Sequence, residues 1–219
     1  MTLRSGDGHL TPKIVNVQQM ADGRLSWVFL EAENRAKLFK ELEAARCAVE
    51  EQREKLEQLT RTDALTGLAN RREFDAALHR IFKDAERSER PVVLMILDLD
   101  NFKKINDSHG HDVGDNALRV LAEILRATSR ETDTVARFGG DEFACILPDA
   151  NEDDAKERCR RLHMSVSELK FECSIKISIG VSVRTTDAPI ASAVALKRAD
   201  QALYTAKQAG RNRTSVWGQ

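Results

Sequence analysis

The chain has 219 residues, of which 42% are hydrophobic, and this is enough for one domain of ordinary size plus an additional segment. Its net charge of -1 creates no overall field that would attract nucleic acid or an anionic membrane. The longest apolar run, residues 92–97, is far shorter than the roughly 20 residues of a membrane span, and the four cysteines lack C-x-x-C spacing. We therefore expect a cytoplasmic protein with reduced thiols, and neither nucleic acid nor a membrane as its partner.

Residues 1–32 contain two strand-like stretches. Residues 14–17 and 25–30 flank a turn-forming Ala-Asp-Gly at positions 21–23. A pair of strands is barely stable alone in water, so this segment must pack on something or be the remnant of a larger fold. The stretch DGRLSWVFLEAENR resembles the last strands of a PAS-type sensor running into its exit helix, although too little precedes it for a complete PAS domain.

Residues 33–60 are charged and contain neither Gly nor Pro, which predicts a helix. Leu42, Val49 and Leu56 are spaced by seven residues. A second series with the same spacing, offset by three, consists of Leu38, Ala45, Gln52 and Leu59. The two series together form the a/d seam of a coiled coil. The alternative is a single amphipathic helix that lies on its own domain.

From residue 61 onward, helical and strand-like patterns alternate, which predicts an α/β sandwich with a mixed sheet flanked by helices. Helices are expected at residues 72–87, at 113–128, from Asn151 onward, and from 193 to Gly210. Asn151 caps its helix with Asp154 at the N3 position. Strands are expected at residues 91–97, 134–138, 142–147 and 171–183, with a hairpin turn at Gly139 and Gly140.

Two acidic patterns point to metal chemistry. Asp98 and Asp100 follow an apolar strand, and ligands bind at the rim of the sheet in α/β folds. Asp141 and Glu142 follow Gly139 and Gly140, whose missing side chains permit a positive φ and leave room for a ligand. Carboxylate oxygens suit Mg²⁺, which takes one or two of them together with substrate phosphates. Taken separately, the first pair could simply terminate a strand, and the second could flank an ordinary hairpin.

Four motifs in order make the sequence resemble the GGDEF family of diguanylate cyclases. They are DALTGLANRR at residues 63–72, DLDNFKKINDSHGHDVGD at 98–115, RFGGDEF at 137–143 and ADQALYTAKQAGRNR at 199–213. The resemblance covers residues 61–219. It implies a nucleotidyl-cyclase-like fold, derived from the ferredoxin-like arrangement, behind a coiled-coil helix.

The resemblance also implies the reaction and its catalytic residues. Two GTP molecules would be condensed into cyclic di-GMP with release of two pyrophosphates. Asp98 and Asp141 would bind Mg²⁺ (or Mn²⁺) through their side chains, with Leu99 contributing its carbonyl. Glu142 would lie beside the reacting ribose, as a base or as a metal ligand. One domain binds one GTP, so two domains must face each other in a homodimer, which the helix at 33–60 would hold together.

Substrate-binding residues follow from the same resemblance. Asn106 and Asp115 match the guanine-reading pair, because a carboxylate accepts from the guanine donors and an amide can donate as well as accept. The remaining contacts would come from Phe102, Leu65 and Leu118 around the base, from Gly139 and Gly140, and from Lys103, Lys207 and Arg211 at the phosphates. Lys207 and Arg211 are four apart, so both can face one anion at the end of the last helix. Structural roles remain open for Leu118 in the core, for Asp115 as a helix cap, and for Lys207 and Arg211 as helix-end cations.

A further site is implied by Arg130 and Asp133, which match the family's R-x-x-D motif for inhibition by the product, cyclic di-GMP. Arg suits bidentate contact with phosphate or guanine, and the alternative is a surface ion pair. Two other functions stay open for the whole domain. One is a catalytically dead receptor for cyclic di-GMP or GTP, and the other is a cyclase that makes a hybrid or mononucleotide product.

Overall fold

The computed structural model divides into two compact units, Met1–Leu59 and Thr60–Gln219. Backbone is described for residues 3–4, 10–11, 14–19, 25–30, 38–50 and 61–218, and side chains are described for residues 38–50 and 61–218. None of the helices in these ranges is both long enough and apolar enough to cross a membrane.

The first unit contains short antiparallel strands and part of the predicted helix. β1 (Leu3–Arg4) pairs with β2 (Leu10–Thr11), and β3 (Ile14–Gln19) pairs with β4 (Leu25–Leu30), which are the two strands expected from the sequence. Residues 38–50 are helical. The predicted seam positions Gln52, Leu56 and Leu59 lie outside the described residues.

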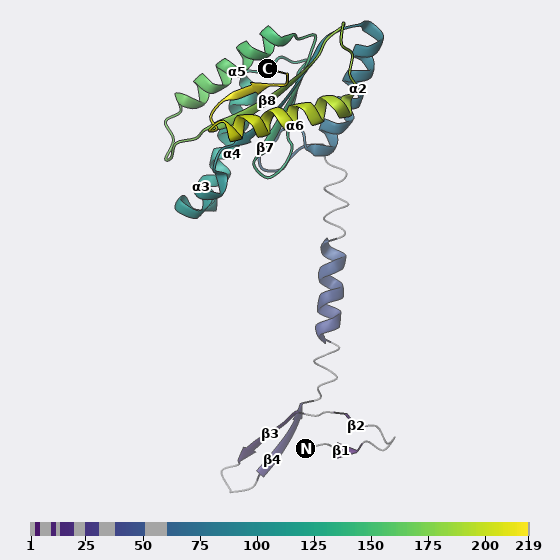
Figure 1. The fold of residues 1–219 in the computed structure, drawn as a ribbon. Helices are drawn as coiled ribbons and strands as arrows, with labels where there is room; N and C mark the ends of the chain where they lie inside the picture. The colour runs from purple at the N-terminus through teal and green to yellow at the C-terminus, as the bar shows by residue number, and fades with distance from the viewer. Residues whose placement is uncertain are drawn as a thin grey trace. The chain divides into compact units, whose positions relative to one another are not determined.

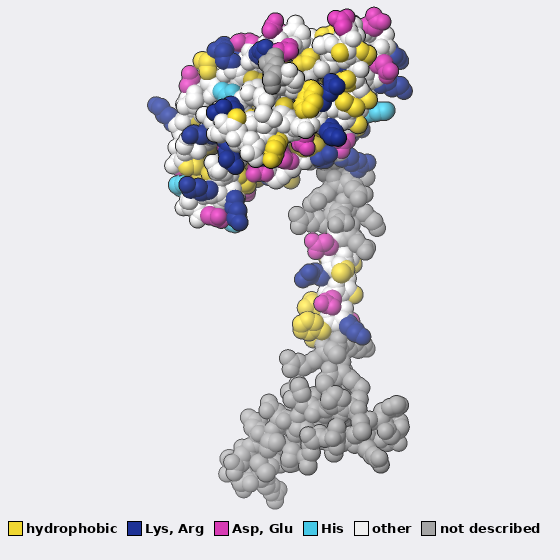
Figure 2. Space-filling model, viewed as in Figure 1, with side chains coloured by type: hydrophobic (Ala, Val, Ile, Leu, Met, Phe, Trp, Pro, Cys, Tyr) yellow, Lys and Arg dark blue, Asp and Glu magenta, His cyan; other side chains and the backbone are white. Residues whose placement is uncertain are grey.

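The described turns of this helix carry large apolar side chains on their surface. Leu38, Phe39, Leu42 and Val49 are each about two-thirds exposed. Charged side chains lie among them (Figure 2). An exposed apolar series on a charged helix is typical of a surface that packs against another helix.

The second unit is built on a five-stranded mixed sheet in the order β6-β7-β5-β8-β9. The strands are β5 (Val92–Leu99), β6 (Thr134–Arg137), β7 (Glu142–Pro148), β8 (Ile177–Arg184) and β9 (Thr214–Val216). β5 is antiparallel to both of its neighbours, β6 is antiparallel to β7, and β9 is parallel to β8. The mixed sheet and the hairpin between β6 and β7 confirm the predicted fold class.

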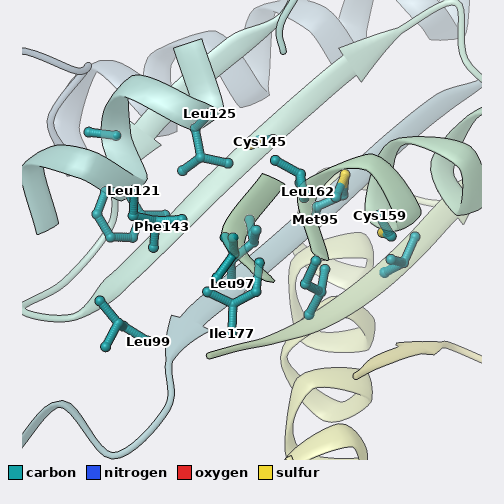
Figure 3. Packing of buried hydrophobic residues seen from close by; sticks show 14 of the residues in the cluster. Met95, Leu97, Leu99, Leu121, Leu125, Phe143, Cys145, Cys159, Leu162 and Ile177 are labelled. Carbon is teal, nitrogen blue, oxygen red and sulfur yellow. The ribbon is translucent and has the colours of Figure 1, made fainter. Parts of the chain in front are cut away.

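Helices cover both faces of the sheet (Figure 1). α2 (Arg71–Ser88) and α6 (Ser192–Gln208) pack on one face with Leu94, Ile96 and Ile146. α4 (His111–Ala127) and α5 (Glu152–Ser167) pack on the other face with Met95, Leu97 and Phe143. Figure 3 shows this second cluster, in which Leu121 lies beside Phe143. Residues of β5 therefore alternate between two cores, which explains its continuous burial.

Several helix ends and strands agree with the sequence, and others do not. The capping box between Asn151 and Asp154 is present at the start of α5. The strand expected at 171–183 forms only from Ile177, because β5 ends at Leu99, the partner of Ile177, and earlier residues have no strand to pair with. The short helix α3 (Phe102–His109) and the three-residue strand β9 were not expected.

α6 lies unusually close to β8 at Gly180. A Cβ at this position would collide with the backbone oxygen of Ala199 and the backbone nitrogen of Leu203. Backbone atoms cannot move aside as a flexible side chain can. Glycine therefore sets the distance of α6 from the sheet, and with it the height of Lys207 at the end of the helix.

Candidate active site

The acidic residues of the two motifs meet because of strand register. Asp98 at the end of β5 is the antiparallel partner of Glu142 at the start of β7, and Leu99 donates its N–H to the Asp141 carbonyl at 3.1 Å. Directly opposed residues of an antiparallel pair share one face of the sheet. Asp98 is two residues after Ile96 in β5, so both point to the same face of the sheet. This is the face that α6 covers, and Glu142, the partner of Asp98, lies on it too.

Asp98 is a buried carboxylate that forms an ion pair with a lysine. It is 7% exposed, and one of its side-chain oxygens lies 2.7 Å from Nζ of Lys207 at the end of α6. Burial raises the pKa of the Asp98 carboxyl above its usual value. Lys207 lowers this pKa, whereas the nearby charges of Asp141 and Glu142 raise it. Asp98, Asp141 and Glu142 thus place three carboxylates beside the ammonium group of Lys207, which leaves an excess of negative charge at this rim.

This excess of negative charge fits a divalent cation. Among the described residues, no group of three or more His, Cys, Asp or Glu side chains is arranged to hold an ion. That arrangement does not exclude Mg²⁺, because this ion commonly takes one or two protein carboxylates and completes its shell with phosphates and water. The donor set predicted from the sequence, Asp98 and Asp141 with the Leu99 carbonyl, consists of the hard oxygen ligands that Mg²⁺ prefers.

The Gly-Gly turn provides room rather than an unusual backbone conformation. Neither Gly139 nor Gly140 has a positive φ, so that part of the sequence prediction is wrong. A Cβ on Gly139 would come within 2.9 Å of the Glu142 carboxylate, whereas a Cβ on Gly140 would meet nothing within 4 Å. Gly139 therefore gives Glu142 its position, and Gly140 leaves an open side that a ligand can approach.

Arg137 and Asp63 hold this turn in place, and sequence reasoning assigned neither of them a role. Nη2 and Nε of Arg137 donate to the Gly140 carbonyl at 2.7 and 3.2 Å, and Nη1 reaches both carboxylate oxygens of Asp63 at 3.2 Å. Partial burial opposes ionisation of Asp63, yet hydrogen bonds from Thr66 and the charge of Arg137 together lower its pKa below the usual value. Asp63 lies in the motif at residues 63–72 and Arg137 in the motif at 137–143, so their pairing joins two motifs that are far apart in the sequence.

The predicted guanine-reading residues lie on consecutive helices. Asn106 is on α3, and its Oδ1 is buried without a hydrogen-bond partner among the described residues. Asp115 is inside α4, whose N-cap is Gly110, so Asp115 does not cap this helix. The neighbouring Gly114 is buried, and a Cβ there would collide with Oδ1 of Asn106. An unpaired buried acceptor is suited to a ligand that brings its own donors.

The residues predicted around the base differ in accessibility. Leu118 is 1% exposed and belongs to the core cluster under α4, which is the structural role left open for it. Leu65 and Phe102 are half-buried and pack against the same cluster. These two therefore retain surface that a base can contact.

The predicted phosphate-binding cations come from three places. Lys103 is exposed on α3, and Lys207 is half-buried at the end of α6. Arg211 is exposed but lies beyond α6, which ends at Gln208, and it has a φ of 63°. The expectation that Lys207 and Arg211 face one anion through helical spacing is therefore wrong, because the helix stops between them.

Arg130 and Asp133 lie beside a cavity of about 300 Å³ away from the acidic rim. The Asp133 carboxylate accepts the backbone N–H of Arg130 at 2.9 Å, and within the described part of the chain the Arg130 guanidinium forms no ion pair. Oδ1 of Asp133 and Nε of Arg158 are buried without hydrogen-bond partners in the same ranges. Arg161, which sequence reasoning missed, also lines this cavity.

Comparison with known proteins places the chain in one family. The family described as "Diguanylate cyclase, GGDEF domain" matches residues 60–213. The probable diguanylate cyclase DgcC of Escherichia coli is 39% identical over 171 residues, which are 76% of this chain and 46% of DgcC. The response regulator PleD of Caulobacter vibrioides is 41% identical over 162 residues, which are 71% of this chain and 36% of PleD. The chain thus spans less than half the length of these relatives.

Solved structures agree with this assignment. The GGDEF domain of DgcB from Caulobacter crescentus, in complex with c-di-GMP, has a TM-score of 0.69 and 33% identity and covers 73% of this chain and 97% of that domain. A second structure, of the coiled coil and GGDEF domain of DgcB, has a TM-score of 0.67 and 34% identity over 82% of this chain and 98% of its own. From the mixed sheet, the acidic rim and these matches together, we conclude that the chain belongs to the GGDEF family of diguanylate cyclases.

Proposed function

We propose that this chain is a Mg²⁺-dependent diguanylate cyclase that condenses two GTP molecules into cyclic di-GMP and two pyrophosphates. The observation that carries the proposal is the meeting of Asp98, Asp141 and Glu142 at one rim of the sheet, with Lys207 beside them. A domain that had become a nucleotide receptor would not need to retain this costly concentration of acids.

In the proposed reaction, the 3′-hydroxyl of one GTP attacks the α-phosphate of the other, and pyrophosphate leaves. Asp98 and Asp141, with the Leu99 carbonyl, would hold Mg²⁺. The ion supplies charge neutralisation at the transferring phosphate. Glu142 lies beside the reacting ribose, and Lys103, Lys207 and Arg211 hold the phosphates. Lys207 lies next to Asp98, the carboxylate that would bind the metal, so its ammonium group can also contact a phosphate bound at that metal.

The domain arrangement follows from the symmetry of the product. The catalytic unit spans residues 61–219, and it follows a coiled-coil helix at 33–60 and the strand-containing segment at 1–32. Each catalytic unit presents one GTP, so the two bonds of cyclic di-GMP form between two facing units. The boundary between the compact units, at residues 59 and 60, supports this division. A solved coiled coil and GGDEF domain of DgcB supports the stalk.

A direct test of the proposal is chromatography of the nucleotides formed when purified protein is incubated with Mg²⁺, GTP and ATP. We expect cyclic di-GMP alone. Bound cyclic di-GMP must be removed from the protein first, because it would mask activity. Binding of GTP without any dinucleotide product would favour the receptor function, and a mixed adenine–guanine product would contradict strict guanine selection.

Base selection depends on Asp115, and its replacement provides a prediction. Asp115→Ala removes the acceptor for guanine N1–H and the amino group, and these donors then stay unpaired in the complex. We expect a loss of GTP affinity of roughly 1–3 kcal/mol, which calorimetry with a non-reacting GTP analogue can measure. ATP affinity should change little, because adenine lacks those donors. Equal GTP affinity before and after the change would show that the base lies elsewhere.

Product feedback provides a second prediction. Arg130 is exposed beside the cavity that Asp133 and Arg161 line, away from the acidic rim. Arg130→Ala should relieve inhibition by cyclic di-GMP and leave the initial rate nearly unchanged, because it removes a bidentate phosphate contact without touching the metal ligands. Progress curves with added cyclic di-GMP measure both quantities. A wild-type protein that its product does not inhibit would exclude a working inhibitory site.

A further inference from the structure

Asp100 has a different position from its neighbour in the Asp-x-Asp pattern. It is 3% exposed, and its carboxylate is engaged on both oxygens. Oδ1 accepts a hydrogen bond from the Ser178 hydroxyl at 2.7 Å, and Oδ2 accepts the backbone N–H of Asn212 at 2.9 Å. Its own N–H donates to the Lys176 carbonyl at 2.9 Å. Asp100 therefore joins the end of β5 to β8 and to the loop after α6.

The loop that Asp100 holds has a costly backbone conformation. Arg211 and Asn212 are consecutive non-glycine residues with φ values of 63° and 47°. Side chains with a Cβ seldom occupy this left-handed region, and such residues persist only where surrounding contacts fix them. The Arg211 N–H donates to the Ala206 carbonyl at 3.1 Å, and Ile179 donates to the Arg213 carbonyl at 2.9 Å. The Asp100 bond lies between these two anchors.

The side chain of Arg211 is free to meet a ligand. Arg211 is exposed, and in the described part of the chain its guanidinium forms no ion pair, while its carbonyl accepts from Nε of Arg213 at 3.1 Å. The direction of this guanidinium depends on the backbone turn, because the residue lies outside the helix that ends at Gln208.

We propose that Asp100 is a positioning residue for Arg211: its buried carboxylate fixes the Asn212 N–H and so holds the left-handed turn that presents the Arg211 guanidinium to the GTP phosphates. The inference rests on the proposed function at one point, namely that Arg211 contacts a phosphate. Asp100 acts through a hydrogen bond to the backbone. It is not a metal ligand.

An asparagine variant can distinguish a positioning role of Asp100 from a role as a metal ligand, because both oxygens of Asp100 accept hydrogen bonds. In Asp100→Asn, the amide oxygen can still accept from Asn212, while the amide nitrogen donates to the Ser178 hydroxyl, which rotates to accept. The asparagine variant therefore keeps both hydrogen bonds without the charge. A metal ligand would lose its function in this variant, whereas a positioning residue would retain it.

The test measures the affinity of the full chain for a GTP analogue with a methylene bridge between the α- and β-phosphates, in Mg²⁺, by calorimetry. We expect Asp100→Ala and Arg211→Ala each to weaken binding about tenfold. The double variant should be no weaker than Arg211→Ala, because the two changes remove one interaction. Asp100→Asn should bind nearly as the wild type does. Ser178→Ala, which removes the other hydrogen bond to Asp100, is the matched control and should have a smaller effect.

A rescue variant keeps the test valid if Asp100→Ala folds poorly. Asp100→Ser keeps a polar group near Ser178 but is too short for Asn212, and it should lose affinity as the alanine variant does. Adding Asn212→Gly to either variant should restore part of the affinity, because glycine adopts the left-handed turn without strain. Melting temperatures identify variants that are folded. A glycine that restores nothing in a folded variant would overturn the proposal.

Two further results would also overturn it, in distinguishable ways. Additive losses in the double variant, or an asparagine variant as weak as the alanine variant, would remove the role of Asp100 and leave the proposed cyclase function intact. Unchanged affinity in Arg211→Ala would remove the phosphate contact itself, and with it both this inference and that part of the proposed function.

Discussion

Replacing Asp98 by Asn should reduce cyclic di-GMP formation from GTP and Mg²⁺ at least about a thousandfold. Metal coordination supplies several kcal/mol of charge stabilisation at a transferring phosphate, and each 1.36 kcal/mol corresponds to a tenfold change in rate. The amide keeps the shape of the side chain and removes the charge. Chromatographic quantification of cyclic di-GMP under single-turnover conditions, with Mg²⁺ varied, measures the loss.

The same variant should not be less stable than the wild type. The pKa of Asp98 is raised in the folded chain, so ionising this carboxyl costs stability. The cost is absent at pH values below the usual carboxyl pKa and reaches its full size at pH values above the raised pKa of the folded chain. The asparagine side chain does not ionise, so the variant does not have this cost. At neutral pH without Mg²⁺, the melting temperature of Asp98→Asn should therefore equal or exceed that of the wild type. A lower melting temperature would show that the ion pair with Lys207 outweighs burial.

A matched control separates loss of the site from loss of a surface charge. Asp84→Asn makes the same chemical change on an exposed part of α2, where Asp84 forms an ion pair with Arg87. It should leave the rate unchanged. An Asp98→Asn variant that retained more than about a tenth of the wild-type rate would exclude this carboxylate as a metal ligand.

Breaking the stalk should produce the second large effect. Leu42→Glu combined with Val49→Glu places like charges opposite each other in a seam of about three heptads, which should shift the chain to a monomer. Turnover should then fall steeply and become dependent on protein concentration, because productive encounters are bimolecular. GTP binding per domain should be unchanged. Light scattering alongside product formation measures both results.

The control for the stalk adds the same charge outside the seam. Ala44→Glu combined with Cys47→Glu changes two positions on the outer side of the predicted heptads, and this pair should leave a dimer with normal turnover. A seam variant that is monomeric and yet fully active at low concentration would mean that residues 33–60 pack on their own domain. It would also contradict catalysis by two facing domains.

The order of the four sequence motifs predicted the family, and two of the motifs, at residues 98–115 and 137–143, combine a strand end with acidic residues. The Asp-x-Asp pattern illustrates where prediction stopped. Asp98 and Asp100 follow one strand, but Asp98 meets Lys207 and Asp100 meets Ser178 and Asn212. These partners are about 80 to 110 residues away in the chain, so no local pattern distinguishes the two acids.

The strand predicted at residues 171–183 and the backbone predicted for the Gly-Gly turn also depend on contacts that the local sequence does not show. Phe171, Cys173 and Ile175 alternate as a strand would, yet strand formation requires a partner, and β5 ends before it could pair with them. The backbone of Gly139 and Gly140 could not be predicted because glycine is chosen either for a left-handed φ or for missing bulk. The Glu142 carboxylate beside Gly139 identifies missing bulk as the cause there.

The contacts of Arg137 have a consequence for truncation of the chain. The sheet begins at Val92 and α2 at Arg71, so a shortened chain that starts at Arg71 would keep every strand and helix of the second unit. It would lose Asp63, and the Arg137 guanidinium that holds Gly140 would then lose its carboxylate partner. Where such a chain folds, we expect a looser turn, in which the Gly139 amide, a donor to the Glu142 carbonyl at 3.2 Å, exchanges hydrogen faster. The smallest piece with an intact catalytic turn therefore begins before Asp63.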